Sequence, residues 1–539
     1  MSRATAVPRV LVEVQGAPLK ESLLAALVSV EVERAWDAPA FLSLRFADPP
    51  LDLHGEPVAL GAELRVRIDD GVEPRELGVF DCTASRWDYG PTGDVALEVE
   101  GLDRLHRLAR RSTGIGETST TLREALRKVT DGVVAGIEGD VPQRKHPSML
   151  QARGSDLDLV RRLCRGVARR FRLDGRDLRL HRSGDGDGLP VKLSLGEELL
   201  SLRVARSIEG QPGAVEARSW DPDAQEPRVA TARKASRSDL GEPADGPSGP
   251  LRVHERPLPA LSAAELLAQG VLDRRRDRSL HLEGVCEGWC GVELGGRIEL
   301  SGVARPQQGV YTVDRVLHRI DAAEGWVSRF EVGAPPAEDT PRSTPAPLVC
   351  SPAVVTQTRD PDQRGRVRVR YDALGERLES DWLRVVHAGA GSRGGSFWTP
   401  HVGDEVLVVL ESESLDAGYV LGGLYSRANA PGKEFEQAPR PKQGFLSRAG
   451  HHILIDDDDD VLELKLDAGS RLRIRNGHVL LRSGGSVEVR DGHGNRLEMG
   501  RSKVRLVSDG ALDLEAADKV HLAGGSVVIS GSRIDFVKS

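Results

Sequence analysis

The chain has 539 residues and a net charge of −8, with 74 basic and 82 acidic side chains interspersed along it. A length of this order predicts about three or four domains, each able to bury a core. The mixed charges argue against nucleic acid or an anionic membrane as the main partner. The first twenty residues lack the apolar core and cleavage site of a secretory signal, and no stretch reaches the roughly 18 apolar residues of a membrane span. We therefore expect a protein that is made in the cytoplasm and stays there unless something carries it out.

The five cysteines are scattered and odd in number, which suits reduced thiols better than a disulfide framework. Cys286 and Cys290 form a lone CxxxC without a second pair of ligands, so zinc is not predicted there.

Residues 1–333 are predicted to form a β-rich domain with a few helices. Apolar and polar residues alternate over 64–69 and 94–103, as in half-buried strands. The next segment has helical periodicity and places three apolar residues on one face: Leu122, Leu126 and Val129.

A second helix is predicted after Ser155, which stands at the N-cap position. Its apolar residues are Leu157, Val160, Leu163 and Val167. A hairpin is expected to turn at Asp174-Gly175. A further helix is predicted within 262–280 and a return to strand over 309–321.

The glycine-rich stretch at 183–188 has the look of a calcium-binding EF-hand loop. Ser183 and Ser194, however, stand where that loop needs its first aspartate and its closing glutamate. We therefore predict a hairpin turn.

Two linkers divide the rest of the chain. The proline-rich residues 334–350 separate the first domain from 351–427, where short strands and turn residues alternate as in a small five-stranded barrel. A second linker, 428–450, leads to the last region, 451–539.

The last region repeats a short strand every seven to ten residues, with Gly, Asn, Asp or Ser usually between. Repeats of this kind are typical of stacked, repetitive architectures. The segments begin at about 461, 471, 478, 486, 496, 503, 511, 519, 526 and 533. Apolar side chains alternate within most of them, so each strand has one apolar face that no helix of the region can cover. We expect other copies of the chain, wrapped around one axis, to cover it.

At the start of this region, His451-His452 precede five aspartates, Asp456 to Asp460. Consecutive strand residues point to opposite faces, so these side chains cannot converge on one cation within a chain. A charged turn is the favoured interpretation. An axial metal shared by several copies stays as the alternative.

Residues 356–431 resemble the OB-fold domain of phage baseplate spikes and of the VgrG spikes of type VI secretion. The match is carried by Asp360-Pro361, Gly365-Arg366-Val367, Trp382 and a run that includes Trp398, Pro400, Gly403, Asp404 and Glu405. The segments 155–182 and 309–320 are similar to the hub of the same families, and 447–465 resembles the opening of the VgrG needle. In layout the chain looks closest to spikes of extracellular contractile injection systems.

The resemblance implies a mainly β fold: a hub (1–333), an OB-fold barrel (351–427) and a trimeric β-helix or β-prism needle (451–539). It implies a homotrimeric spike that contacts an inner tail tube, baseplate proteins, effector cargo and a separate PAAR-type tip protein, and that leaves the cell as part of an injection particle. The tip is expected to dock on Ile534, Phe536 and Val537.

No catalytic, cofactor or metal residues are predicted. The sequence has no GxSxG, HExxH or phosphate-loop motif, and acidic pairs such as Glu197-Glu198 are common in a chain with 29% charged residues. A peptidoglycan hydrolase hidden in the hub, or a type VI secretion spike, are the alternatives.

Overall fold

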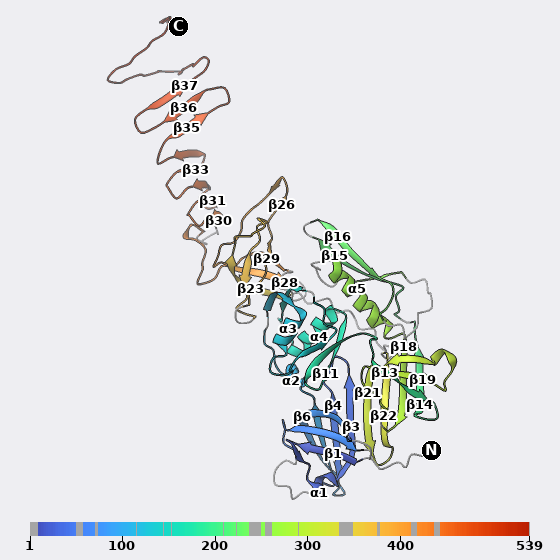
Figure 1. Ribbon diagram of the computed structural model, residues 1–539. Coiled ribbons are helices and arrows are strands. Elements are labelled where there is room, and N and C mark those ends of the chain that lie inside the picture. The colour runs from blue at the N-terminus through green and yellow to red at the C-terminus, as the bar shows by residue number, and fades with distance from the viewer. Residues whose placement is uncertain are drawn as a thin grey trace. The chain divides into compact units, whose positions relative to one another are not determined.

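A computed structural model describes residues 9–49, 58–69, 74–114, 116–143, 145–151, 154–208, 210–221, 224–236, 249–253, 261–288, 290–333, 349–374, 378–410, 418–435 and 442–537. The fold is mainly β, as predicted (Figure 1). The chain divides into two compact units, Met1–Leu424 and Tyr425–Ser539. The first linker falls mostly outside the described residues, which resume at Val349.

The first unit contains an eleven-stranded sheet within the described residues, in the order β14-β18-β22-β21-β3-β4-β7-β6-β5-β1-β2. Two apolar cores pack against it, one on the β3–β7 side and one on the β18–β22 side. A short helix, α1 (Glu21–Leu24), lies in the β2–β3 connection. The strands are β14 (Leu199–Arg206), β18 (Leu280–Glu287), β22 (Gly325–Val332), β21 (Arg315–Asp321), β3 (Leu27–Ala35), β4 (Phe41–Ala47), β7 (Val95–Leu102), β6 (Arg75–Tyr89), β5 (Glu63–Asp69), β1 (Arg9–Val14) and β2 (Ala17–Pro18).

In sequence, the segment that follows β7 forms a helical subdomain with its own core. Its helices are α2 (His106–Ala109), α3 (Leu122–Val129) and α4 (Asp156–Gly166), and its strands are β8 (Gly116–Thr121), β9 (Ile137–Gly139), β10 (Lys145–Leu150), β11 (Arg169–Asp174) and β12 (Asp177–Arg182). Ser155 caps α4 as predicted, because its hydroxyl accepts from the Asp158 N–H and the Asp158 carboxylate accepts from the Ser155 N–H. The hairpin at Asp174-Gly175 is also confirmed, since β11 and β12 pair antiparallel.

The hairpin predicted at 183–188 is wrong. β12 pairs with β11 and β9, whereas the next strand, β13 (Asp187–Ser194), pairs parallel with β19 (Gly296–Ser301). The glycine-rich stretch therefore connects two sheets. Local turn chemistry cannot distinguish this connection from a hairpin, because both need the same turn residues.

Two smaller sheets complete the hub. In the first, β20 (Gly309–Thr312) pairs with β19 on the side away from β13. A 3₁₀ helix spans Arg305–Gln307, just before β20. β15 (Val215–Asp221) lies between β16 (Glu226–Ala232) and β17 (Leu251–Val253), and the helix α5 (Leu261–Arg276) packs on this sheet.

The barrel has the five strands that were predicted, in the order β24-β23-β28-β29-β25. They are β23 (Val349–Gln357), β24 (Arg368–Arg370), β25 (Arg384–Val385), β28 (Glu405–Leu410) and β29 (Gly418–Gly423), with a small hairpin of β26 (Ala390–Gly391) and β27 (Gly394–Gly395). Alternating buried valines and leucines of β23 and β28 form its core.

The second unit contains two meandering sheets. The first has β30 (Gln443–Leu446), β31 (His452–Asp456), β32 (Val461–Lys465), β33 (Arg471–Arg475) and β34 (His478–Arg482), and the second has β35 (Val487–Arg490), β36 (Arg496–Met499) and β37 (Val504–Val507). A 3₁₀ helix at Lys433–Phe435 precedes them. β30 falls in the stretch assigned to a linker. Its apolar residues are few and lie among prolines, so only its pairing with β31 identifies it.

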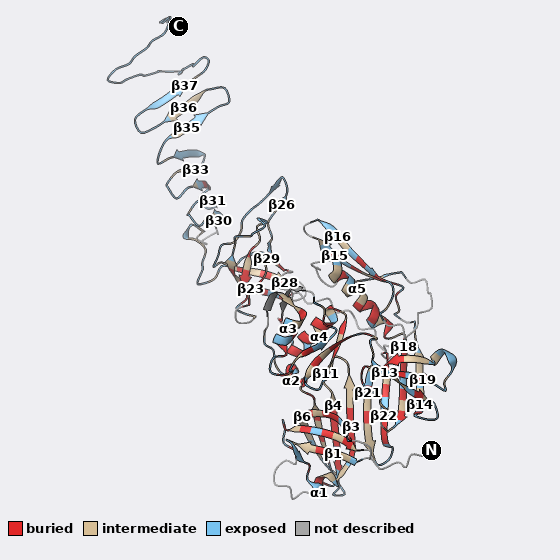
Figure 2. Ribbon diagram, viewed as in Figure 1, coloured by how far each residue is buried: buried red, intermediate tan, exposed pale blue. Residues whose placement is uncertain are grey.

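The strands predicted at 511, 519, 526 and 533 are not formed in the single chain, where residues 508–537 contain no assigned strand. Figure 2 shows how exposed this unit is: among its described residues, only His452, Asp456, Val461 and Glu463 are buried. No helix of the described residues is long and apolar enough to cross a membrane.

Candidate functional site

The strand register places most of the apolar residues of the two sheets on one face of each sheet. In the first sheet two rows run across the strands: Phe445, Ile453, Leu464, Leu472 and Leu481, and beside them Ile455, Leu462, Ile474 and Val479. In the second sheet the rows are Val487, Met499 and Val504, and Val489, Leu497 and Leu506. We call these fifteen residues the apolar face. Twelve of them are between 38% and 69% exposed, and the other three are half-buried.

The opposite face of the first sheet is mostly polar and better covered, although it also carries Leu446, Leu454, Val461 and Leu480. We call it the polar face. His452 Nε2 lies 3.0 Å from Glu463 Oε1, and the guanidinium groups of Arg471 and Arg473 lie 3.9 and 3.8 Å from the other oxygen. Each chain therefore covers its polar face and exposes its apolar one, the reverse of what a monomeric sheet needs.

The aspartate run forms the turn of the β31–β32 hairpin. The Asp456 carboxylate accepts from the N–H groups of Asp458 and Asp459, both at 3.2 Å, and lies 3.2 Å from Lys442 Nζ. Asp460 has φ of +48°, a left-handed conformation that aspartate tolerates. A turn is thus the role that the contacts support.

The histidines divide between two environments. His451 is exposed and its Nδ1 accepts from the Asp467 N–H at 3.0 Å, whereas His452 lies on the polar face. His452 and Asp456 point away from Ile453 and Ile455, so an inward-turned apolar face would direct both away from the axis. Among the described residues, no group of three or more His, Cys, Asp or Glu side chains is placed to hold a metal ion.

The barrel motif builds a turn at the start of β28. Gly403, at φ of +93°, donates to the Val355 carbonyl at 2.8 Å, and the Asp404 carbonyl accepts from the Val355 N–H at 3.0 Å. The Asp404 carboxylate accepts from the His401 N–H at 2.8 Å, and Glu405 begins the strand. The contacts bring Gly403, Asp404 and Glu405 together. They leave Trp398 51% exposed and Pro400 half-buried.

A second barrel element closes a loop. The Arg366 guanidinium donates to both oxygens of the buried Asp360 carboxylate, at 2.7 and 2.9 Å. This bidentate pair lowers the pKa of Asp360 well below its usual value, so the pair remains charged over the physiological range.

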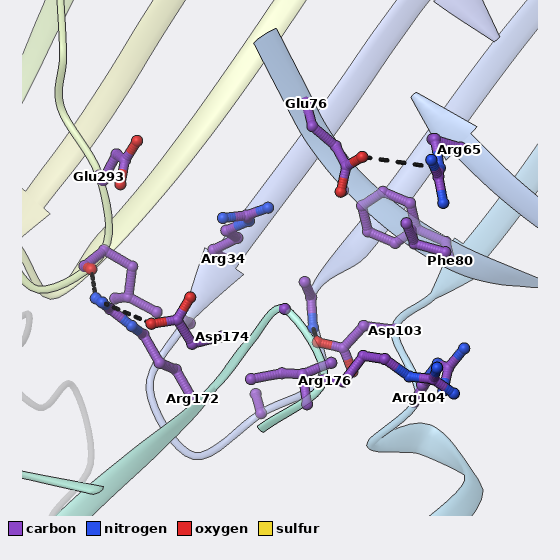
Figure 3. Close-up of a pocket in the computed structure, with 18 of the residues that line it drawn as sticks. Arg34, Arg65, Glu76, Phe80, Asp103, Arg104, Arg172, Asp174, Arg176 and Glu293 are labelled. Atoms are coloured by element: carbon purple, nitrogen blue, oxygen red, sulfur yellow. Dashed lines mark hydrogen bonds and ion pairs between the residues drawn. The ribbon is translucent and has the colours of Figure 1, made fainter. Parts of the chain in front are cut away.

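Sequence reasoning missed a cavity in the hub, of about 430 Å³. Figure 3 shows Arg34 in the middle of it, with Glu293 and Asp174 on one side and Glu76 and Phe80 on the other. Its charged lining residues are five arginines and five carboxylates: Arg34, Arg65, Arg104, Arg172 and Arg176, and Glu63, Glu76, Asp103, Asp174 and Glu293. They come from segments almost 260 positions apart, so no local motif could have revealed the cavity.

Asp103 lies at the inner wall of the cavity. It is 5% exposed, and its carboxylate accepts from the N–H groups of Ala40 and Leu105 at 2.8 and 2.9 Å. Burial raises its pKa to about 6, and burial also lowers the pKa of Arg34. Both shifts indicate a poorly hydrated interior.

Comparison with known proteins shows what the chain is similar to. Residues 351–425 match the Type VI secretion system/phage-baseplate injector OB domain. The type VI secretion spike protein VgrG1a of Pseudomonas aeruginosa is 27% identical over 255 residues, which cover 43% of this chain and 38% of the relative. The chain is therefore similar to VgrG spike proteins, and residues 351–425 carry the injector OB domain that type VI secretion and phage baseplates share.

Solved structures of two other proteins share this fold. A VgrG in the PdpA-VgrG complex of Francisella is 9% identical at a TM-score of 0.57, and the match covers 89% of each chain. The E. coli c3393 protein, a component of the type VI secretion system similar to T4 tail proteins gp27 and gp5, is 15% identical at a TM-score of 0.50, covering 77% of this chain and 99% of that one.

The expected tip-docking residues of the spike lie at the end of its described chain. Ile534, Phe536 and Val537 are 47%, 90% and 88% exposed. The segment that carries them has no assigned strand, so their docking role stays a prediction.

Proposed function

We propose that this spike acts as the homotrimeric centre of a contractile injection system, in which it joins the tail tube and baseplate to a needle that is driven through a target envelope. The observation that carries the proposal is the apolar face, which runs through two successive sheets and is exposed in the single chain. Exposed apolar surface of this extent is typical of an interface.

The same chain is the simplest cover for this face. Single-layer meanders of three and five strands, with one apolar face and no covering helix, cannot close a core alone. Identical copies around one axis would bury every apolar row inward and leave the Glu463 cluster outside. Three copies is the number that resemblance to the family suggests.

The proposed work is mechanical, and no enzymatic activity is proposed. We expect the purified protein to leave peptidoglycan intact. Clearing of a peptidoglycan suspension that is lost when an acidic pair of the hub is neutralised would favour the rival, a hydrolase within the hub.

The proposed partners are an inner tail-tube protein, baseplate proteins, a PAAR-type tip protein and effector cargo, in a particle assembled in the cytoplasm and released on firing. The Francisella relative was solved in a complex with PdpA, which supports a partner-binding role for this fold. Deletion of 533–539 should abolish binding of the tip without dissociating the trimer. Retained tip binding would place the dock elsewhere.

The mass of the full-length chain in solution tests the central proposal. We expect three times the monomer mass of 58.3 kDa by sedimentation velocity at micromolar concentration. A monomer at that concentration would contradict it.

A further inference from the structure

Arg34 is a charged group in the hub cavity without a charged partner. Its guanidinium donates to the Leu77 carbonyl at 2.5 Å. No carboxylate of the described residues lies within 4.0 Å of it, although five carboxylates line the same cavity. A poorly hydrated guanidinium with unused donors favours an anionic ligand, and carboxylates fit its fork geometry best.

Glu293 is the complementary group at the cavity rim. Three other carboxylates have arginine partners: Glu76 lies 3.7 Å from Arg65, Glu63 lies 3.5 Å from Arg104, and Asp174 lies 3.2 Å from Arg179. Glu293 has no basic partner within 4.0 Å in the described part of the chain, although Arg34 feels its charge. Arg34 and Glu293 thus attract each other across the cavity without direct contact, and Arg176 of the same lining also has no ion-pair partner within 4.0 Å in the described part of the chain.

We propose that the hub cavity binds a ligand that carries both a carboxylate, which pairs with Arg34, and an ammonium group, which pairs with Glu293. Free zwitterions and peptide segments with an acidic and a basic side chain share this chemistry. The volume of about 430 Å³ is within the range of small-molecule sites. The site lies within one chain, so the proposal does not depend on trimer formation.

Gly78 leaves space for the Arg34 side chain on the cavity floor. Gly78, at φ of +149°, lies beneath the guanidinium, and a Cβ there would meet the Phe80 ring at 2.7 Å and Arg34 Nη2 at 3.3 Å. The backbone of a glycine is thus what allows both side chains to occupy the floor. Leu173 and Leu294 supply apolar wall for the methylene groups of a ligand.

The test is a calorimetric titration of the full-length protein with two probes: 5-aminovalerate, as the small zwitterion, and the capped peptide acetyl-Glu-Gly-Lys-amide, as the protein segment. We expect saturable binding of at least one probe, and the probe that binds identifies the source. Arg34→Leu should weaken binding by about 10- to 100-fold, the loss expected for a charged hydrogen-bonded pair.

Two variants make the result decisive. Glu293→Gln alters an exposed side chain, so it should fold normally and still lose about two- to fivefold in affinity for the zwitterion. Arg86→Leu removes an exposed arginine of β6, paired with Glu98 outside the cavity, and should bind like the unaltered protein. Absence of saturable binding for both probes, or equal affinity in the Glu293→Gln variant, would overturn the proposal.

Discussion

Two neighbouring residues of β35 offer a sharp test of the apolar face. Val489 lies on that face and is 54% exposed in the single chain, whereas the Arg490 side chain points to the other face and is 64% exposed. Glutamine at either position would be a surface substitution in a monomer, worth about 0.5 kcal/mol or less. In the proposed trimer, only Val489→Gln would introduce an amide into an interface.

The expected magnitude follows from these exposures. Full burial of a valine contributes about 1.5–3 kcal/mol, so burying its exposed half contributes about 0.8–1.6 kcal/mol per chain. An amide buried without a partner costs about 1–3 kcal/mol more. The Val489→Gln change should thus cost about 2–5 kcal/mol per chain, or about 5–14 kcal/mol for three chains.

Sedimentation equilibrium over a wide concentration range measures this difference. We expect Val489→Gln to dissociate at concentrations where the unaltered protein and Arg490→Gln remain trimeric. An unchanged mass for Val489→Gln over the whole range, or equal dissociation of Arg490→Gln, would refute the assignment of the apolar face as the interface.

Three further outcomes are expected. Arg170 pairs with Asp277 and lies 2.7 Å from Asp314, and both carboxylates are largely buried, so Arg170→Met should cost about 3–5 kcal/mol and lower the hub melting temperature, followed by calorimetry. Burial raises the pKa of Asp103 from 3.8 to about 6, so the contribution of Asp103 to stability should fall by about 3 kcal/mol as pH rises between these values. The difference in stability between Asp103→Asn and the unaltered protein should therefore change with pH over this range. Amides of 511–536 should be protected from hydrogen exchange in the assembled protein but not in a dissociated variant.

A matched variant controls the first of these predictions, and each of the other two has an outcome that would contradict it. Arg329 pairs with Glu324 at 3.1 Å on an exposed surface, so Arg329→Met should change stability by only about 0–1 kcal/mol. A loss as large as that of Arg170→Met would show that the burial of the hub pair is unimportant. An unchanged pH profile in Asp103→Asn, or equal exchange of 511–536 in both states, would contradict the respective predictions.

Local pattern was enough to predict those elements of this fold that are specified within a few residues, but not most of the hub strands. Ser155 with Asp158, the alternation in β32 and β35, and the turn at Asp174-Gly175 are all specified within a few residues, so the sequence predicts them directly. β30 could not be predicted in this way, because its four residues have a strand conformation only through pairing with β31. The connection at 183–186 was missed for the same reason, since its role depends on a strand more than a hundred residues later.

The two candidate sites also differ in whether the sequence predicts them. The apolar face could be predicted because a two-residue period in sequence becomes one face of a sheet. The Arg34 cavity could not be predicted, because Arg34 and Glu293 come to line the same cavity only after the hub strands have paired. Gly78, whose role is to leave space beneath Arg34, is indistinguishable in sequence from a turn glycine.

The contrast between residues 452–507 and 508–537 bears on how the needle forms. Both have alternating apolar residues, yet only the first forms strands in the single chain. A strand needs a partner backbone as well as an alternating pattern, because its N–H and C=O groups must be paired. In the second stretch, the apolar residues from Leu512 to Phe536 are at least about as exposed as those of the apolar face. If neighbouring copies supply both the cover and the backbone partners there, this stretch gains its structure only on assembly, and the needle would become ordered toward its tip as the chains come together.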